Sequence, residues 1–423
     1  MVRASCPALL LSAPASGQGK TLCTAALGRA WRNRGLQVQV FKCGPDFLDP
    51  MILQVASGKP VYNLDLGMCG VADAQHRLYQ AAQENDVILL EGVMGLYDGT
   101  PSSADIALNF GIPVALTIDA SAMAQTFGAL ASGLLNFNSA IKPAGVIANR
   151  IGGKDHADFL RNSLPVNIPW LGALTAEACY SLPERHLGLH RASEIEDLEL
   201  RIESAAQALS ESSELLLPPA VELPSSNIQG YPQLLTGKTI AVARDAAFCF
   251  IYPANLECLQ AMGAHLVYFS PLRNEAVPEA DAYWLPGGYP ELHLAAISNN
   301  REMRESLDQA FKTGKPILAE CGGMMALCES IDGQPGFGLL PGKSRVEKQL
   351  QGIGTQHLQL DGNHISGHTF HHGVFETSLE PHCAAETPYG TGENFYRYGC
   401  ISASFLHFYF PSNPHVAAGF FQA

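Results

Sequence analysis

The sequence predicts two α/β domains, each built around a largely parallel β-sheet. Short apolar runs alternate with longer amphipathic stretches in the first half of the chain, and the alternation begins again after a proline- and serine-rich segment. Apolar runs of this length, without alternating polar residues, are typical of strands buried on both faces of a parallel sheet. The length of 423 residues also fits two domains.

The first domain is predicted to be doubly wound. Six apolar runs mark its strands: Pro7–Ser12, Gln37–Lys42, Asp86–Glu91, Pro113–Ile118, Ala144–Asn149 and Ile168–Ala173. The stretches between them, such as Thr21–Arg34 and Val71–Glu84, have the length of crossover helices. Strands and helices that alternate in this way predict helices on both faces of a parallel sheet.

A change in composition marks the predicted domain boundary. Proline, serine and glycine interrupt any regular period over residues 211–237, which we predict to be a linker between domains 1–210 and 238–423. Four apolar runs predict strands of the second domain: Thr239–Ala243, His265–Phe269, Ala282–Leu285 and Pro316–Ala319. The last part of the chain is richer in glycine, histidine and aromatic residues, which favours antiparallel strands.

The composition argues against several kinds of protein. Lys and Arg number 26 and Asp and Glu 40, so the formal net charge is −14, which is unsuited to binding nucleic acid through phosphates. The eleven cysteines include no C-x-x-C pair, which favours reduced thiols over a zinc site or disulfides. No apolar stretch reaches the about 18 residues of a membrane span. We therefore expect a cytoplasmic protein without a nucleic-acid or membrane partner.

A phosphate-binding loop is predicted between the first strand and the first helix. The segment is Ala13-Pro14-Ala15-Ser16-Gly17-Gln18-Gly19-Lys20-Thr21. It follows the general phosphate loop G-x-x-x-x-G-K-[ST] in its last three residues, while a proline replaces the first glycine. The backbone N–H groups of Ser16, Gly17 and Gly19 can surround phosphates, Lys20 can neutralise phosphate charge, and the Thr21 hydroxyl can ligate Mg²⁺. We expect an ATP site; the alternative is a glycine-rich turn with a chance lysine.

Two carboxylates and a second lysine stand at the same edge of the predicted sheet. Lys42 ends the second strand, Asp46 follows it, and Glu91 ends the third strand. Ligands gather at the carboxyl ends of parallel strands, so Asp46 and Glu91 can join Thr21 in binding Mg²⁺, and Lys42 can meet the γ-phosphate. The alternatives are turn chemistry for Asp46 and a helix cap or solvated strand end for Glu91.

A cysteine stands at a predicted strand-to-helix turn in the second domain. The last predicted strand continues into Glu320-Cys321-Gly322-Gly323 and then an apolar helix. Small residues beside a nucleophile are what such a sharp turn needs, and we expect the helix N-terminus to lower the pKa of the Cys321 thiol. Gly287 and Gly288, which also follow a strand, can direct N–H groups at an oxyanion. The alternative for Cys321 is a small core residue.

A nucleophilic thiol needs a base. Among fourteen histidines, His407 is the candidate, because it lies at the end of a late apolar run; a histidine that only packs in the core is the alternative. The segment Gly367–His372 holds three more histidines. We predict a structural or substrate-facing role for them rather than a metal site, because no further ligand set is apparent.

Several blocks, in the same order along nearly the whole chain, resemble the cobyrinic acid a,c-diamide synthase family, which includes the hydrogenobyrinic acid a,c-diamide synthases. The blocks are Ala13–Thr21, Lys42–Pro50, Asn63–Asp65, Glu91–Gly99 and Leu182–Leu189. The resemblance implies a dethiobiotin-synthetase-like P-loop domain and a class I glutamine amidotransferase-like α/β domain. Gly67 replaces a usual tryptophan, and Ser366 and Thr369 replace a usual arginine and glutamate. Tyr409 stands where ordinary class I amidotransferases carry an acid two residues after the catalytic histidine; this family also lacks that acid, which implies a Cys–His dyad.

The resemblance implies ATP- and glutamine-dependent amidation of the a and c acetate groups of a corrin polycarboxylate in cobalamin biosynthesis. Cys321 would attack glutamine, His407 would protonate the departing ammonia, and the N–H groups of Gly288 and Gly322 would bind the oxyanion. Mg²⁺ and ATP would convert the corrin carboxylate into an acyl phosphate, which ammonia then attacks after following a path shielded from water. Asn149 resembles the residue that reads adenine in related domains.

The net charge implies that a few basic side chains hold the polyacid. The candidates are Lys42, Lys59, Arg150, Arg185 and His186. Related enzymes suggest a homodimer. Two alternatives remain: an amidotransferase for another tetrapyrrole, such as cobyric acid synthase or a nickel-sirohydrochlorin diamide synthase, and a nucleotide-switched binding protein with a vestigial amidotransferase domain.

Overall fold

The computed structural model of the chain describes residues 2–185, 188–189, 191–228 and 230–423. The chain divides into two compact units, Met1–Ile228 and Gln229–Ala423. None of the helices in the described residues is long and apolar enough to cross a membrane.

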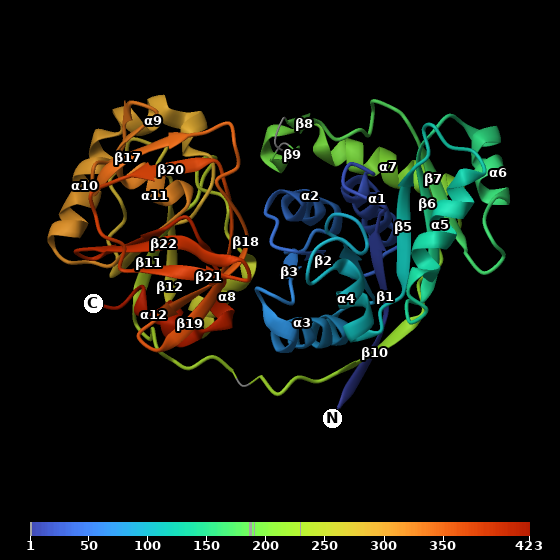
Figure 1. Cartoon of the computed structure of the whole chain (residues 1–423), viewed down its shortest axis with the longest axis horizontal. Coiled ribbons are helices and arrows are strands. Elements are labelled where there is room, and N and C mark those ends of the chain that lie inside the picture. Colours follow the sequence, from blue (N-terminus) through green and yellow to red (C-terminus); the bar gives the residue numbers. More distant parts are fainter. Residues whose placement is uncertain (1, 186–187, 190, 229) are drawn as a thin grey trace. The chain divides into compact units, whose positions relative to one another are not determined.

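The first unit is built on a parallel sheet with the strand order β3-β2-β4-β1-β5-β6-β7 (Figure 1). The strands are β1 Arg3–Ser12, β2 Val38–Cys43, β3 Tyr62–Leu64, β4 Val87–Glu91, β5 Val114–Asp119, β6 Pro143–Ile151 and β7 Trp170–Thr175. All six predicted strands are present. The three-residue strand β3 was not predicted, because so short a strand has no recognisable period.

Helices cover both faces of this sheet. They are α1 Lys20–Asn33, α2 Leu48–Ser57, α3 Gly70–Glu84, α4 Ser103–Phe110, α5 Thr126–Phe137, α6 Lys154–Asn162 and α7 Leu198–Ser212. Leu9 and Leu11 of β1 pack in one core with residues of α1, α2 and α7, while Leu10 packs in a second core with residues of α3, α4 and α5. Consecutive strand residues face opposite sides of the sheet, so this continuous apolar run contributes to the core on each face. Burial on both faces is what the predicted doubly wound fold requires.

The segment predicted as a linker is partly structured. Strand β10, Ala220–Pro224, pairs antiparallel with the amino-terminal half of β1, from Arg3 to Pro7. Val221 and Leu223 are buried while Glu222 between them is exposed. This short alternation of buried and exposed residues lies between prolines. It was therefore read from the sequence as part of a turn-rich linker. The first unit therefore extends to residue 228 rather than 210.

The second unit contains a ten-stranded sheet with the order β12-β11-β13-β14-β23-β22-β21-β18-β19-β24. The parallel strands are β11 Thr239–Ala243, β12 His265–Phe269, β13 Ala282–Leu285, β14 Ile317–Glu320 and β23 Ile401–Ser404. The antiparallel strands are β18 Gly352–Leu360, β19 Asn363–His371, β21 Cys383–Thr387, β22 Gly390–Tyr398 and β24 His407–Phe408. The four predicted strands and the antiparallel character of the carboxyl-terminal part are confirmed. Strand β12, however, lies at the edge of the sheet, and its residues are exposed or half-buried rather than buried.

Smaller elements complete the two units. The helices of the second unit are α8 Pro253–Ala261, α9 Leu294–Asn299, α10 Arg301–Lys312, α11 Gly322–Leu327 and α12 Pro414–Gly419. The single-turn helices are η1 Ala192–Glu194, η2 Pro290–His293 and η3 Phe410–Ser412. A second small sheet holds β15 Cys328–Ile331, β16 Gln334–Pro335, β17 Leu340–Val346 and β20 Gly373–Glu376, and β8 Glu184–Arg185 pairs with β9 Gly188–Leu189.

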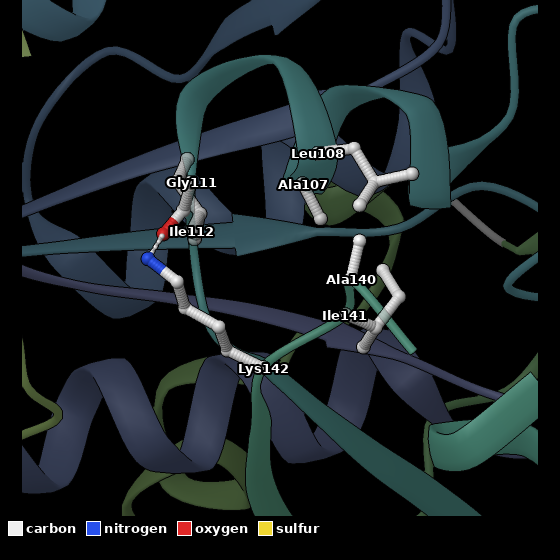
Figure 2. A pocket seen from close by; sticks show the side chains of 7 residues that line it. All are labelled: Ala107, Leu108, Gly111, Ile112, Ala140, Ile141 and Lys142. Carbon is white, nitrogen blue, oxygen red and sulfur yellow. Dashed lines mark hydrogen bonds between the residues drawn. The ribbon is translucent and has the colours of Figure 1, made fainter. Parts of the chain in front are cut away.

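A cavity of about 270 Å³ lies at the amino ends of β5 and β6, beside the end of α4 (Figure 2). Leu108, Ile112 and Ile141 supply apolar lining, and Lys142 at its edge donates a hydrogen bond to the carbonyl of Gly111 (3.2 Å). The loop after β1 lies at the opposite, carboxyl end of the same parallel sheet. The cavity is therefore separate from the predicted phosphate site.

Candidate active sites

The phosphate loop joins the end of β1 to the start of α1. Gly17 and Gly19 have φ angles of 77° and 84°, which glycine adopts without strain. Asn149 of β6 donates from Nδ2 to the carbonyl of Gln18 (3.0 Å). A Cβ atom at position 19 would lie 2.1 Å from that Nδ2 atom. The close approach of Asn149 therefore requires glycine at position 19.

Lys20 lies at the start of α1 and bridges the loop to the segment after β4. Its Nζ atom donates to the carbonyls of Met94 (2.6 Å) and Ala15 (3.2 Å). Burial, assisted by the charge of Lys42, lowers the pKa of Lys20 to about 8. A phosphate is a stronger acceptor for an ammonium group than a carbonyl, so the lysine is well placed to exchange these contacts for an anion.

A buried charged network joins α1, β2 and β4. Glu91 is fully buried, and its Oε1 atom accepts from the Thr21 hydroxyl (3.0 Å) and from Lys42 Nζ (2.7 Å). Lys42 also donates to Asp49 Oδ2 (2.6 Å). Burial raises the pKa of Glu91 to about 7, against the opposing effect of Lys42. Burial would also raise the pKa of Asp49, but the Lys42 ammonium holds it below its usual value.

Asp46 lies in the loop after β2, near this network. Its Oδ1 atom accepts from the backbone N–H of Leu48 (2.8 Å), and burial, with the neighbouring Asp49, raises its pKa. Asn63 holds the loop in place by donating to the carbonyls of Gly44 and Asp46, both at 2.8 Å. Asp46 therefore does accept a hydrogen bond within its own turn, as the alternative to metal binding proposed.

The residues at this edge fit a divalent cation. Hydroxyl and carboxylate oxygens are the ligands Mg²⁺ prefers, and Oε2 of Glu91 is buried without a hydrogen-bond partner in the described part of the chain. No group of three or more His, Cys, Asp or Glu side chains in that part could hold a metal ion by itself.

Asp49 was not singled out from the sequence. It lies in the first turn of α2, three residues after Asp46, and contacts the lysine that ends β2. Two carboxylates spaced three residues apart at a helix start face the same side. That spacing was the signal that could have identified Asp49.

Cys321 lies at the junction between β14 and α11. Its φ angle is 47°, in the left-handed region that residues other than glycine seldom adopt, and its N–H donates to the carbonyl of Ser404 (2.7 Å). A Cβ atom at Gly323 would lie 2.0 Å from the carbonyl oxygen of Leu285. The sharp turn thus depends on a residue without a side chain.

The glycines after β13 approach both Cys321 and His407. A Cβ atom at Gly287 would lie 2.1 Å from Cε1 of His407, and one at Gly322 would lie 2.9 Å from the carbonyl oxygen of Gly288. Glu320, next to Cys321, accepts from the backbone N–H of Phe408, next to His407 (2.8 Å). These contacts bring the predicted nucleophile, base and oxyanion glycines into one region.

His407 begins β24 and pairs with His368 of β19. It is 3% exposed, and burial, with contributions from His368 and His371, lowers its pKa to about 3. The imidazole is therefore neutral at physiological pH. A neutral imidazole can accept a proton, which is what a base beside a thiol must do.

The expected lowering of the Cys321 pKa is wrong. Burial, and after it the charge of Glu291, raises the pKa of the thiol. Helix α11 has only six residues, and the cysteine is 6% exposed, so desolvation of the thiolate outweighs the helix N-terminus. The helix N-terminus is therefore not enough to lower the pKa of this thiol.

The histidine-rich strand β19 supports the segment that precedes His407. His371 stacks on Phe405 (ring centroids 3.9 Å apart). Its Nε2 atom lies 2.8 Å from Glu393 Oε1, and its Nδ1 atom lies 2.9 Å from the carbonyl oxygen of Gly373. These contacts favour the structural role predicted for the segment.

The other predicted basic residues are engaged or not described. Lys59 donates to the side chain of Asn85 (2.6 Å), and Arg150 donates to Asp119 (2.6 Å) and to the carbonyl of Gly17 (3.2 Å). Arg150 thus belongs to the phosphate loop region. His186 lies outside the described residues, and of Arg185 only the backbone is described.

Glu291 gives the second unit a predictable response to pH. It follows Pro290 in η2, and burial raises its pKa from 4.5 to about 7. Between these values the folded state binds more protons than the unfolded state, so stability falls as pH rises through this window. We expect a Glu291→Gln variant to unfold at nearly the native Tm at pH 5. At pH 8 its Tm should be a few degrees higher, since ~1 kcal/mol shifts the Tm of a unit this size by about 2–4 °C.

Thermal unfolding at both pH values, with the exposed Glu329→Gln as the control, checks this expectation. A difference in Tm that does not change between pH 5 and pH 8 would mean that Glu291 does not titrate in this window.

Two family matches cover most of the chain. Residues 9–188 match the CobQ/CobB/MinD/ParA nucleotide binding domain, and residues 239–415 match the CobB/CobQ-like glutamine amidotransferase domain. Fold and sites together define the class of protein: a glutamine-dependent, amide-forming ligase with a nucleotide-binding unit.

Relatives identify the family within this class. The chain is 52% identical to hydrogenobyrinate a,c-diamide synthase from Stutzerimonas stutzeri, over 99% of both chains. It is 50% identical to the enzyme of that name from Pseudomonas aeruginosa, over 99% of this chain and 98% of the other. It is 46% identical to cobyrinate a,c-diamide synthase from Herminiimonas arsenicoxydans, over 98% and 96%. The chain belongs to the family of cobyrinate and hydrogenobyrinate a,c-diamide synthases, and the resemblance stated from the sequence is confirmed.

Proposed function

We propose that this protein amidates the a and c acetate groups of hydrogenobyrinate or cobyrinate, with ATP as the activating nucleotide and glutamine as the nitrogen source. The observation that carries the proposal is the 52% identity to a hydrogenobyrinate a,c-diamide synthase over nearly the full length of both chains. The grouping of Cys321 with His407, and of Lys20 with Thr21, supports it.

In the glutamine half-reaction, the Cys321 sulfur attacks the carboxamide carbon while neutral His407 takes the thiol proton. The N–H groups of Gly288 and Gly322 stabilise the oxyanion. The tetrahedral intermediate then collapses to a glutamyl thioester, and His407 passes the proton to the departing ammonia. Water hydrolyses the thioester and releases glutamate. Burial raises the pKa of the Cys321 thiol and lowers that of the His407 imidazole, so we expect the proton to move during the attack rather than before it.

In the synthetase half-reaction, the corrin carboxylate attacks the γ-phosphorus of ATP, the bond to the β,γ-bridging oxygen breaks, and ADP leaves an acyl phosphate behind. Phosphate is a far better leaving group than oxide, so ammonia can then displace it and form the amide. The loop N–H groups of Ser16, Gly17 and Gly19 bind the phosphates. Lys20 and Lys42 stabilise the charge that moves onto the phosphate oxygens.

Three further assignments complete the nucleotide site. Asn149, which contacts the loop through Gln18, would recognise the adenine base. Thr21 and Glu91 would hold Mg²⁺ bound to the phosphates, with Asp46 as the further carboxylate, and the bound ion would offset phosphate charge. The unpartnered Oε2 atom of Glu91 supports the metal assignment. The eleven free cysteines support a cytoplasmic location.

The decisive experiment incubates the chain with ATP, Mg²⁺ and glutamine, and with either hydrogenobyrinate or cobyrinate. We expect mass spectrometry to show two successive replacements of a hydroxyl by an amino group, dependent on ATP, with at least one ring. The two arms show whether cobalt must already be present. Glutamine hydrolysis with no ATP-dependent change in either ring would contradict the proposal.

A further inference from the structure

Glu320 is a buried carboxylate whose two oxygens both accept N–H groups. It ends β14 directly before Cys321 and is 1% exposed. Oε1 accepts from the backbone N–H of Phe408 (2.8 Å), and Oε2 accepts from the indole N–H of Trp284 (2.7 Å). Its side chain thus connects the residue before the proposed nucleophile to the residue after the proposed base.

A carboxylate is unusual in this environment. Trp284 packs on Phe410 (ring centroids 4.9 Å apart), and removing a carboxyl group from water is unfavourable unless its oxygens accept hydrogen bonds. Burial raises the pKa of Glu320 to about 8, against the opposing effect of the two N–H donors. A glutamine could not serve both donors in the same way, because its amide has only one acceptor atom. The two donors therefore require an acceptor oxygen on each side of the carboxyl group, which a glutamine does not offer.

The bond to Phe408 fixes the peptide next to His407. The carbonyl of Phe408 accepts from Asn255 Nδ2 (2.7 Å), so both polar groups of this residue end on buried side chains. Strand β24 has only two residues, His407 and Phe408, and it has little backbone pairing of its own. Any shift of the Phe408 peptide would move the imidazole that lies against Gly287.

We propose that Glu320 is a positioning residue that orients His407 toward Cys321 by fixing the peptide of Phe408. It would replace the acid that ordinary class I amidotransferases carry at the position of Tyr409. That acid would stand two residues after the histidine, whereas Glu320 acts through the backbone N–H of Phe408 from the end of β14. The proposal rests on the proposed roles of Cys321 and His407.

The test measures glutamine-dependent and ammonium-dependent amide formation in the full chain carrying Glu320→Gln. We expect kcat with glutamine to fall on the order of tenfold to a hundredfold, the size of effect that a misplaced catalytic group produces. KM for glutamine and the ammonium-dependent rate should stay within about twofold of the native values, because the variant leaves substrate contacts and the other site intact. Trp284→Phe is the matched control: it removes the other donor to the same carboxylate, keeps the Phe408 contact, and should leave kcat nearly unchanged.

Glu320→Asp is the second variant if Glu320→Gln does not fold. It keeps both carboxyl oxygens but draws them back by one methylene, so kcat with glutamine should again fall while KM holds. The proposal is overturned if kcat with glutamine is unaffected, if both nitrogen sources lose activity together, or if Trp284→Phe loses as much as Glu320→Gln. A native chain without glutamine-dependent activity, or a Cys321→Ser variant that retains it, would instead overturn the proposed function.

Discussion

A Cys321→Ser variant should lose glutamine-dependent amide formation by on the order of 10⁴-fold or more, because a nucleophile removed from a catalytic pair costs nearly the whole contribution of the pair. The serine hydroxyl is far less acidic than the thiol, so transfer of its proton to His407 is much less favourable in a site built for a thiol. Amide formation with added ammonium salt should remain near the native rate, since the phosphate loop lies in the other unit. Product formation with each nitrogen source, measured by mass spectrometry, checks both halves of the expectation.

The matched control is Cys328→Ser. Cys328 is also fully buried in the second unit, and its Sγ atom contacts the carbonyl of Met324 (3.3 Å), a contact that a serine hydroxyl can keep. It should retain activity with both nitrogen sources. If Cys321→Ser failed with ammonium as well as with glutamine, the two reactions would not occur at separate sites.

The second large effect is expected for Lys20→Ala. The variant removes the ammonium group that bridges the loop to the carbonyl of Met94, and with it the charge proposed to stabilise the transferring phosphoryl group. Amide formation should fall on the order of 10²- to 10³-fold with either nitrogen source. Glutamine hydrolysis by Cys321 should remain measurable. Rates of glutamate release and of amide formation, followed in the same reaction, separate the two outcomes.

Lys142→Ala is the control for this variant, because it removes a lysine from the opposite end of the same sheet. Its amide formation should match that of the native chain. Loss of amide formation with Lys142→Ala, or full activity with Lys20→Ala, would contradict the role given to the loop lysine.

The buried strands could be predicted because each carries a signal that depends on its own residues. Thr239–Ala243 and Ala282–Leu285 are continuous apolar runs, and the structure has strands with the same bounds. Strand β10 was not predicted, because it is recognisable only from its pairing with a distant strand. Only the partner strand β1 shows that the alternation of Val221 and Leu223 is strand pairing rather than part of a linker.

The site residues also divide into those with a local sequence signal and those that depend on tertiary contacts. The phosphate loop and the turn at Cys321 have local spacing rules, and the structure gives each the local conformation that the rule requires. Glu320 has its role only through residues distant in sequence, namely Phe408 and Trp284. Asp49 lies only seven residues from its partner Lys42, so the local sequence could have indicated it. The pKa of Cys321 was mispredicted for a related reason: local sequence indicates a helix terminus, but burial depends on everything packed around it.

The pairing of β10 with β1 affects the order in which the chain can fold during synthesis. Domains generally fold as units from the amino-terminal end as they leave the ribosome. In this unit, the amino-terminal half of β1, from Arg3 to Pro7, has its partner strand in Ala220–Pro224. That pairing cannot form until Ala220–Pro224 has been synthesised. The carbonyl of Leu215 accepts hydrogen bonds from Trp31 and from Arg34 of the α1 region. Leu215 is also synthesised long after these two donors. The nucleotide-binding unit therefore cannot close until nearly all of its own residues have emerged, while it needs none of the residues that form the thiol site.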